Sequence, residues 1–180
     1  MSATVHRTPE AALQAEVGGS SPVARYTWAV VRLLLAFEFL WAFVDKTFGF
    51  GLATPAEAAW VRGGSPTTGY LSGVEGPFGS IFTPLAGNVF IDWLFMLGLL
   101  GIGLALALGI GMRIAAGAGA VLLLMMWLTA LPIPVNPFVD SHVIEAAVLI
   151  GLAASLAGDT LGLGRRWAST DLVRRFPVLR

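Results

Sequence analysis

The sequence predicts an all-α integral membrane protein, built as a bundle of four transmembrane helices. Two observations lead to this fold class. Of the 180 residues, 56% are hydrophobic and only 12% are charged, whereas soluble domains carry about 25% charged residues. The chain also has four apolar stretches long enough to cross about 30 Å of hydrocarbon as helices. They cover residues 26–48, 89–110, 114–131 and 137–157, which places a single transmembrane domain within residues 25–160.

Arginine and lysine residues predict the orientation of the bundle. They gather before the first span, between the second and third spans, and after the fourth, at Arg7, Arg25, Arg113, Arg165, Arg166, Arg174, Arg175 and Arg180. The opposite side holds only Lys46 and Arg62. By the positive-inside rule, both termini are expected to be cytoplasmic. Residues 1–24 are then a disordered cytoplasmic tail, and residues 161–180 are a basic cytoplasmic tail.

Residues 49–87 are expected to form a long extracytoplasmic loop between the first two spans. A capping-box pattern begins at Thr54, with proline at the first helical position, and predicts a short helix over residues 55–62. A second short helix is expected over residues 77–85, between two glycines. Long loops in compact proteins are often lids or binding loops, so this one is expected to lie over the outer mouth of the bundle.

Small residues at a spacing of four predict the seams between helices, because close packing must replace the hydrophobic effect inside a bilayer. The predicted seam residues are Gly101, Ala105 and Gly109 in the second span, Ala116 and Ala120 in the third, and Ala147, Gly151 and Ser155 in the fourth. Asn136 is expected to cap the fourth span, with Pro137 at its first position.

Several ionisable residues lie within the apolar segments or at their ends. One charged residue near the bilayer centre costs about 2.5–3.5 kcal/mol, so a set of them indicates a ligand site, an ion path or a proton path. The set comprises Glu38, Asp45, Lys46, Asp92, Asp140, His142 and Glu145. With the predicted orientation, all of them except Glu38 lie at the extracytoplasmic ends of the spans. Glu38 is expected near the midplane.

Four of these residues are the candidate catalytic groups: Glu38, Asp45, His142 and Glu145. Asp45 follows Glu38 by seven positions and is expected on the same helix face. His142 and Glu145 are three positions apart on one helix, so their side chains are expected to touch and to exchange protons. The alternative is that Glu38 and His142 only make structural hydrogen bonds.

Lys46, Arg62, Asp92 and Asp140 are the candidate substrate-binding residues. Lys46 either extends to the outer headgroups or holds an anion in the mouth of the bundle. Arg62 and Asp92 are the expected partners of Asp45 and Lys46. Asp92 and Asp140 have an alternative role, since an acidic side chain in the first turn of a helix favours the helix dipole. Arg32, in the first span, is expected to extend to the interface or to pair with a carboxylate.

The composition limits which cofactors the chain can bind. The chain has no cysteine, which excludes a disulfide framework and an iron–sulfur cluster carried by its own thiolates. It has two histidines, one of them in the N-terminal tail, so a bis-histidine haem within one chain is excluded. A His-x-x-Glu pair without a matching half predicts no bound metal. The net charge of zero offers no reason to expect nucleic acid as a partner.

The ordered set of these motifs resembles the DoxX/DoxD family of membrane proteins. The resemblance rests on the apolar run from Arg32 to Lys46, on Gly-Ile-Gly-Met-Arg113, on Asn136-Pro-Phe-Val-Asp140-Ser-His142, and on the Ala-Gly158-Asp-Thr-Leu-Gly-Leu-Gly-Arg ending. It covers residues 25–167 and implies a four-helix bundle in the bacterial plasma membrane. For the DoxD branch it implies the membrane subunit of a thiosulfate:quinone oxidoreductase.

Three functions follow as hypotheses. The first is a quinone-linked oxidoreductase subunit that passes electrons from thiosulfate or a related reductant to membrane quinone, which is then the co-substrate. The second is a non-catalytic membrane anchor or partner of a redox complex, and the third is a small transporter. The expected partners are the lipid bilayer, a second oxidoreductase subunit and a second copy of this chain.

Overall fold

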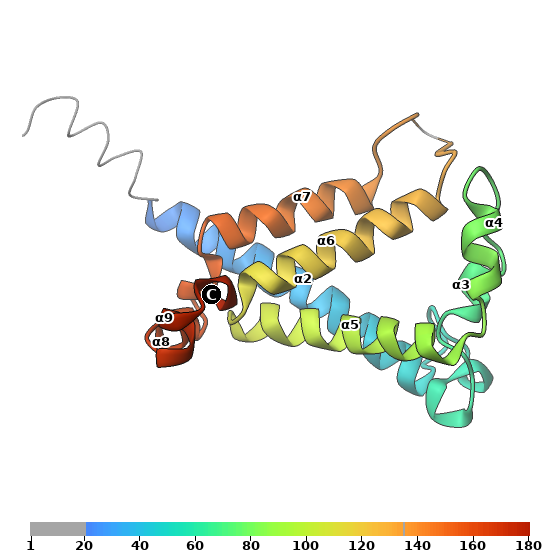
Figure 1. Cartoon of the computed structure of the whole chain (residues 1–180), viewed down its shortest axis with the longest axis horizontal. Helices are drawn as coiled ribbons and strands as arrows, with labels where there is room; N and C mark the ends of the chain where they lie inside the picture. Colours follow the sequence, from blue (N-terminus) through green and yellow to red (C-terminus); the bar gives the residue numbers. More distant parts are fainter. Residues whose placement is uncertain (1–20, 135) are drawn as a thin grey trace, which may run out of the picture.

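The computed structural model describes residues 21–134 and 136–180, and every regular element in that part of the chain is a helix (Figure 1). Within it, three helices are long and apolar enough to cross a membrane: α2 Pro22–Phe48, α5 Val89–Leu108 and α6 Met112–Thr129. A fourth apolar helix, α7 Ser141–Ala154, has 14 residues, or about 21 Å at 1.5 Å per residue. The predicted all-α class is confirmed, while α7 alone is shorter than a full membrane crossing.

The first helix begins before the position that the sequence predicts. Ser21 is its N-cap, where the side chain accepts a hydrogen bond from the Ala24 amide at 3.2 Å, and Pro22 occupies the first helical position. These residues belong to the segment predicted as a disordered tail, of which residues 1–20 lie outside the described part of the chain. The helix ends at Gly49, whose φ of +67° is a conformation that glycine adopts without strain.

The fourth helix differs from its predicted span of 137–157 at both ends. Asp140, rather than Asn136, is the N-cap. Asn136 instead accepts hydrogen bonds from the amides of Phe138 and Val139, at 3.0 and 2.6 Å, which closes an Asx-type turn ahead of the helix. At the other end, the helix stops at Ala154, and a 3-10 turn, η4 Ala157–Asp159, follows.

The four long helices are arranged as two pairs, α2 with α5 and α6 with α7 (Figure 1). The pairs are closest at the end where α5 gives way to α6, and they diverge toward α3 and α4. We call the diverging end the loop end and the opposite end the terminal end. One continuous apolar core joins the pairs, and its fully buried members include Met96, Leu106, Leu149 and Leu152.

The predicted packing seam of the second span is wrong at Gly101 and correct at Gly109, which is buried against Gly158. Gly101 is exposed, and a Cβ atom added there would meet open space. Gly103 is the buried glycine, and its added Cβ would lie 2.7 Å from Leu40 Cγ. In α6 the predicted seam residues Ala116 and Ala120 are buried. The spacing of small residues correctly indicates that these helices pack closely. Which face of a helix is buried depends on the neighbouring helix, which the spacing does not show.

The long loop between α2 and α5 contains short helical segments. They are η1 Ala56–Ala58, η2 Trp60–Arg62, α3 Thr68–Leu71, α4 Gly79–Phe82 and η3 Thr83–Leu85. The predicted helices at 55–62 and 77–85 therefore occur as successive short turns, and α3 is additional. Tyr70 shares a 2.6 Å hydrogen bond with Thr129, the last residue of α6. The loop thus connects the α2–α5 pair to α6 at the loop end.

The segment predicted as a basic tail is folded. It forms α8 Gly164–Ala168, α9 Asp171–Arg175 and η5 Pro177–Leu179, which lie beside the terminal end (Figure 1). The Arg113 amide donates to the backbone oxygen of Arg180 at 3.0 Å, and Trp167 Nε1 donates to the carbonyl of Leu179 at 2.6 Å. These bonds hold the segment against the start of α6.

Candidate functional site

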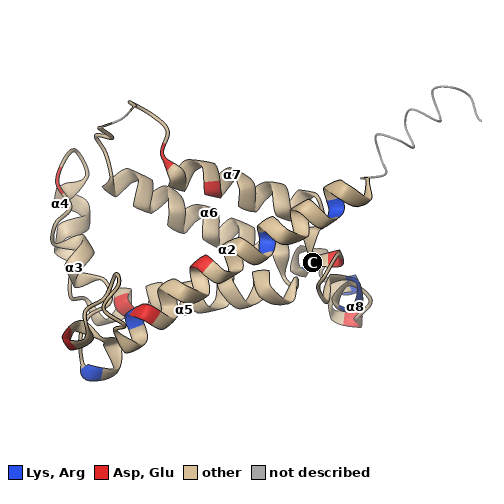
Figure 2. Ribbon diagram, turned by 180° about the vertical axis from the view of Figure 1, so that it is seen from behind, with Lys and Arg blue, Asp and Glu red and all other residues tan. Residues whose placement is uncertain are grey.

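The structure divides the predicted charged residues into two groups at the loop end. Figure 2 shows acidic and basic positions gathered where α2 ends and α5 begins, and separate acidic positions at the start of α7. The first group contains Asp45, Lys46, Arg62 and Asp92, and the second contains Asp140, His142 and Glu145. Glu38 lies in α2, seven residues before Asp45.

Asp92 anchors the loop rather than binding its predicted charged partners. The side chain is buried, and its Oδ1 accepts hydrogen bonds from Ser65 Oγ at 2.9 Å, Thr67 Oγ1 at 2.6 Å and the Thr67 amide at 3.2 Å. The carboxylate sits in the first turn of α5, as the helix dipole favours. Its hydrogen bonds hold residues 65–67 against α5, so the alternative structural role of Asp92 fits this geometry.

Asp45 is the unusual member of the first group. Its side chain is 1% exposed, and neither carboxylate oxygen has a hydrogen-bond partner among the described residues. Lys46 does not pair with it; its Nζ lies 5.8 Å from the centre of the Phe95 ring, within the range of a cation–π contact. Arg62 is exposed. The expected ion pairs of Asp45 and Lys46 with Arg62 and Asp92 are therefore absent from residues 21–134 and 136–180.

A buried carboxylate without a partner is rare, because burial removes its hydration and nothing replaces it. Native proteins retain such groups mainly where chemistry or binding requires them. Asp45 therefore remains a candidate functional residue. The seven-residue spacing predicts that Glu38 and Asp45 share one face of the helix, but their surroundings differ. Glu38 is exposed, whereas Asp45 is buried.

The second group is organised around Asp140. One of its oxygens, Oδ1, caps α7 by accepting from the Val143 amide at 3.2 Å, and the other, Oδ2, lies 2.6 Å from His142 Nδ1. The predicted partner of His142 was Glu145, but the N-cap side chain turns back over the first helical turn and reaches the imidazole first. The two residues form what we call the Asp140–His142 dyad.

The dyad fixes the tautomer of the histidine. Partial burial by itself raises the pKa of Asp140, but the hydrogen bonds from the His142 side chain and the Val143 amide outweigh it and leave the pKa below its ordinary value. The carboxyl group is therefore ionised at neutral pH and can only accept hydrogen bonds. Nδ1 must then carry a proton, which leaves Nε2 as the nitrogen that exchanges protons with its surroundings.

Two further carboxyl groups continue from the dyad into the apolar region. Glu145 is half-buried and lies about one turn further along α7 than His142. Glu38 lies on α2, which is a neighbour of α7. The structure thus places His142 and Glu145 together at the start of α7 and leaves Asp45 at the end of α2. Among the described residues, no three His, Asp or Glu side chains are placed to hold one metal ion.

Arg32 is the buried charge whose role the sequence did not predict. Its guanidinium is 0% exposed and has no carboxylate partner in the described part of the chain. Instead it donates to backbone carbonyls at the end of α5, those of Leu106 and Ala107, and to those of Thr160 and Leu161. The C-terminal end of a helix carries partial negative charge, which satisfies a cation there. We call this contact the Arg32 junction.

The capping role of Asp140 can be tested by mutation and acid titration. Asp140→Ala is expected to lower the free energy of unfolding by about 1 kcal/mol, because the cap is lost. In the unmutated protein, the stabilisation by Asp140 is complete above the ordinary carboxyl pKa, about 4. It is lost as the pH falls through the lower pKa of the folded state. Asp140→Asn keeps the cap and should flatten this part of the acid dependence.

The measurement is thermal unfolding in detergent between pH 7 and pH 3. Glu75→Gln, in an exposed part of the loop, removes one carboxylate without touching a cap and serves as the control. If Asp140→Asn and Glu75→Gln change the acid dependence equally, the depressed pKa of Asp140 is contradicted.

The sequence was compared with protein-family models, curated proteins and solved structures, and none of them matches. The resemblance to the DoxX/DoxD family therefore stays a prediction from the motifs.

Proposed function

We propose that the chain is a DoxX/DoxD-like membrane subunit of a quinone-linked oxidoreductase. In this proposal α2, α5, α6 and α7 cross the bacterial plasma membrane, and the loop end faces the extracytoplasmic side. Electrons from thiosulfate or a related reductant reach membrane quinone, directly or through a second subunit.

The observation that carries the proposal is the Asp140–His142 dyad with Glu145 and Glu38 beyond it. Reduction of a quinone consumes two protons along with two electrons, so a quinone site needs proton donors at membrane depth. An imidazole whose Nδ1 is held by a carboxylate presents Nε2 for proton exchange, which is the arrangement used in general acid–base catalysis. In this proposal, Glu145 on α7 and Glu38 on α2 continue the proton route from the loop end toward the middle of α2.

Asp45, Lys46 and Arg62 complete the proposal at the loop end. Arg62 is exposed and Lys46 is partly buried, so both are available to attract an anionic reductant such as thiosulfate. Asp45 supplies a further, buried protonatable group near the end of α2. Asp92 is left out of the binding role, because one of its oxygens already accepts three hydrogen bonds from the loop.

Quinol formation in proteoliposomes tests this function. The purified full chain is reconstituted with a quinone and supplied with thiosulfate, with and without a membrane extract that provides partner subunits. His142→Gln is expected to lower the rate by a factor of about 100 or more, the usual effect of losing a general acid or base. Glu145→Gln and Glu38→Gln should lower it as well, while Glu75→Gln should leave it unchanged. Quinol formation that survives His142→Gln, or none under any condition, contradicts the proposal.

One observation favours the second candidate function, a non-catalytic partner within a redox complex. Glu38 is exposed on the surface of α2, 16 residues from its start and 10 from its end. A carboxylate facing lipid at that depth costs about 2.5–3.5 kcal/mol. Contact with another membrane helix, from a second subunit or a second copy of this chain, removes that cost. Purification of an intact complex whose activity survives Glu38→Gln and His142→Ala would select this function over the first.

A further inference from the structure

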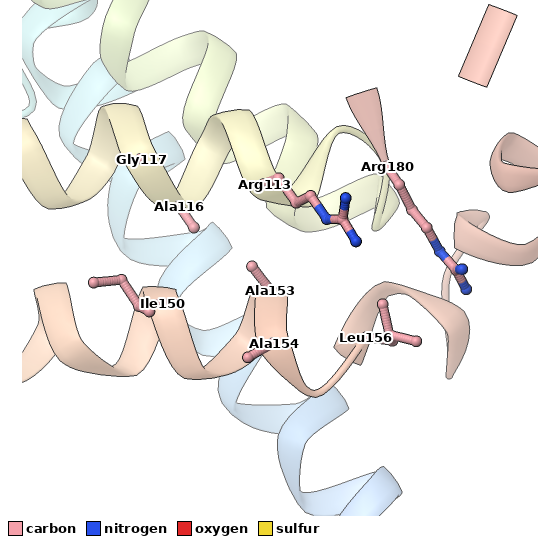
Figure 3. A pocket seen from close by; sticks show the side chains of 8 residues that line it. All are labelled: Arg113, Ala116, Gly117, Ile150, Ala153, Ala154, Leu156 and Arg180. Atoms are coloured by element: carbon pink, nitrogen blue, oxygen red, sulfur yellow. The ribbon is translucent and has the colours of Figure 1, made fainter. Parts of the chain in front are cut away.

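A pocket lies at the terminal end, away from the predicted charged residues. It lies between the start of α6 and the end of α7, with a volume of about 560 Å³, and the C-terminal segment borders it (Figure 3). We call it the α6–α7 pocket. It is independent of the proposed redox function, since none of the proton-transfer candidates lines it.

The two ends of the pocket differ in chemistry. Small apolar groups line one part, including Ala116 and Gly117 of α6 and Ala153 of α7. Arg113 and Arg180 border the other part (Figure 3). Arg113 is in the first turn of α6, so the arginines lie at the end of an apolar helix of membrane-spanning length. The pocket therefore runs from the level of an interface into the level of hydrocarbon.

The arginines retain donors for an anion. Arg113 Nη1 donates to the Pro177 carbonyl at 2.9 Å, and Arg180 Nη2 donates to Asp159 Oδ2 at 2.9 Å. A guanidinium has five N–H donors, so these bonds leave most of them free. Arg180 Nε is buried and has no partner among the described residues. Asp159 offsets one of the two positive charges, and the positive end of the α6 dipole adds to the other.

A positively charged rim at the interface above an apolar groove matches one class of ligand, an anionic phospholipid. Guanidinium groups bind phosphate oxygens in a bidentate manner, and basic pockets between transmembrane helices bind anionic headgroups. We propose that the α6–α7 pocket binds an anionic phospholipid, with its phosphate at Arg113 and Arg180 and one acyl chain along Ala116, Gly117 and Ala153. With the orientation that the arginine distribution predicts, this lipid belongs to the cytoplasmic leaflet, where anionic lipids attract basic residues.

Gly117 offers a way to close the pocket without changing its charge. It is exposed, and a Cβ atom added there meets nothing within 4 Å. Gly117→Leu is therefore expected to keep the helix intact, since leucine favours helix more than glycine does. Its side chain would occupy the space assigned to the acyl chain. Gly117→Leu therefore tests the acyl-chain contact while keeping Arg113, which also holds the C-terminal segment through Pro177.

Native mass spectrometry of the purified full chain in detergent is the experiment, with phosphatidylglycerol and phosphatidylcholine as competing probes. The unmutated chain is expected to retain phosphatidylglycerol with a roughly tenfold preference, as two arginines near a headgroup allow. The double change R113Q/R180Q should remove the preference, and Gly117→Leu should reduce retention of both lipids. The matched control is R165Q/R166Q, which removes two exposed charges of α8 at the same end and should change neither.

Three results would overturn the proposal. The first is a preference for phosphatidylglycerol that persists in both R113Q/R180Q and Gly117→Leu. The second is an equal loss of preference in R165Q/R166Q, which would indicate attraction by general charge. The third is displacement of phosphatidylglycerol by inorganic phosphate at a matching concentration, which would make the pocket an anion site without a role for the acyl chain.

Discussion

An Arg32→Ala variant is expected to unfold at a markedly lower temperature than the unmutated protein. Arg32 is fully buried and donates to four carbonyls, from the last turn of α5 and from the segment after α7. Removing it takes a charged donor away from those carbonyls, of which Leu106 and Thr160 accept from Arg32 in buried surroundings. Hydrogen bonds to charged groups contribute about 1.5–3 kcal/mol each and are not additive. A loss of about 3–5 kcal/mol is therefore expected, a large fraction of a typical total of 5–15 kcal/mol.

The measurement is the thermal unfolding midpoint in detergent, together with the yield of monodisperse protein. Arg32→Lys should recover only part of the stability, because one ammonium group cannot reach carbonyls on two separate segments. Arg25→Ala is the matched control, because Arg25 is exposed and lies about two turns earlier on α2. Its loss should leave the unfolding midpoint unchanged. An Arg32→Ala protein as stable as Arg25→Ala would contradict the structural role of the Arg32 junction.

A Gly158→Ala variant is expected to lose about 3 kcal/mol of stability at the same junction. A Cβ atom on residue 158 would lie 2.3 Å from the backbone oxygen of Gly109 and 2.9 Å from its carbonyl carbon. Both atoms belong to backbone, which cannot rotate away as a side chain can. Overpacking of a well-packed site costs about 1–3 kcal/mol, and the upper end is expected here because α5 and the segment after α7 must separate.

The control for this prediction is Gly101→Ala in α5. Gly101 is exposed and has open space around an added Cβ, so alanine there should leave stability unchanged or raise it by up to about 1 kcal/mol. Thermal unfolding of the two variants in one detergent compares them directly. Equal stability of Gly158→Ala and Gly101→Ala would show that the backbones at Gly109 and Gly158 are not in close contact.

The long helices were predictable because hydropathy is a sum over neighbouring residues. An 18-residue window needs no knowledge of the rest of the fold, and α2, α5 and α6 were found in this way. The start of α7 was not, because two good capping residues compete there. Asn136 and Asp140 both have side chains that accept from backbone amides, and in the structure the first closes a turn while the second caps the helix.

The candidate site was predicted in composition but not in pairing. The sequence selected His142, and helical spacing favoured Glu145 as its partner. The observed hydrogen bond goes to Asp140, two positions earlier, which becomes available only because that residue is an N-cap outside the helix. The sequence predicted that Asp92 pairs with a positively charged residue. In the structure its carboxylate instead accepts hydrogen bonds from hydroxyl groups of the loop. The Ser65-Pro66-Thr67 sequence offers those hydroxyls, although nothing in it points to Asp92.

The sequence by itself determined the helical class, the apolar segments of spanning length and the residues whose charge needs an explanation, since each depends on residue type and near neighbours. Only the tertiary structure decided the partners. It placed Arg32 against the end of α5, buried Asp45 with no hydrogen-bond partner in the described part of the chain, and joined Arg113 and Arg180 at one pocket. Such pairings depend on which helix faces meet, and that is set by the packing energy of the whole chain rather than by any local pattern.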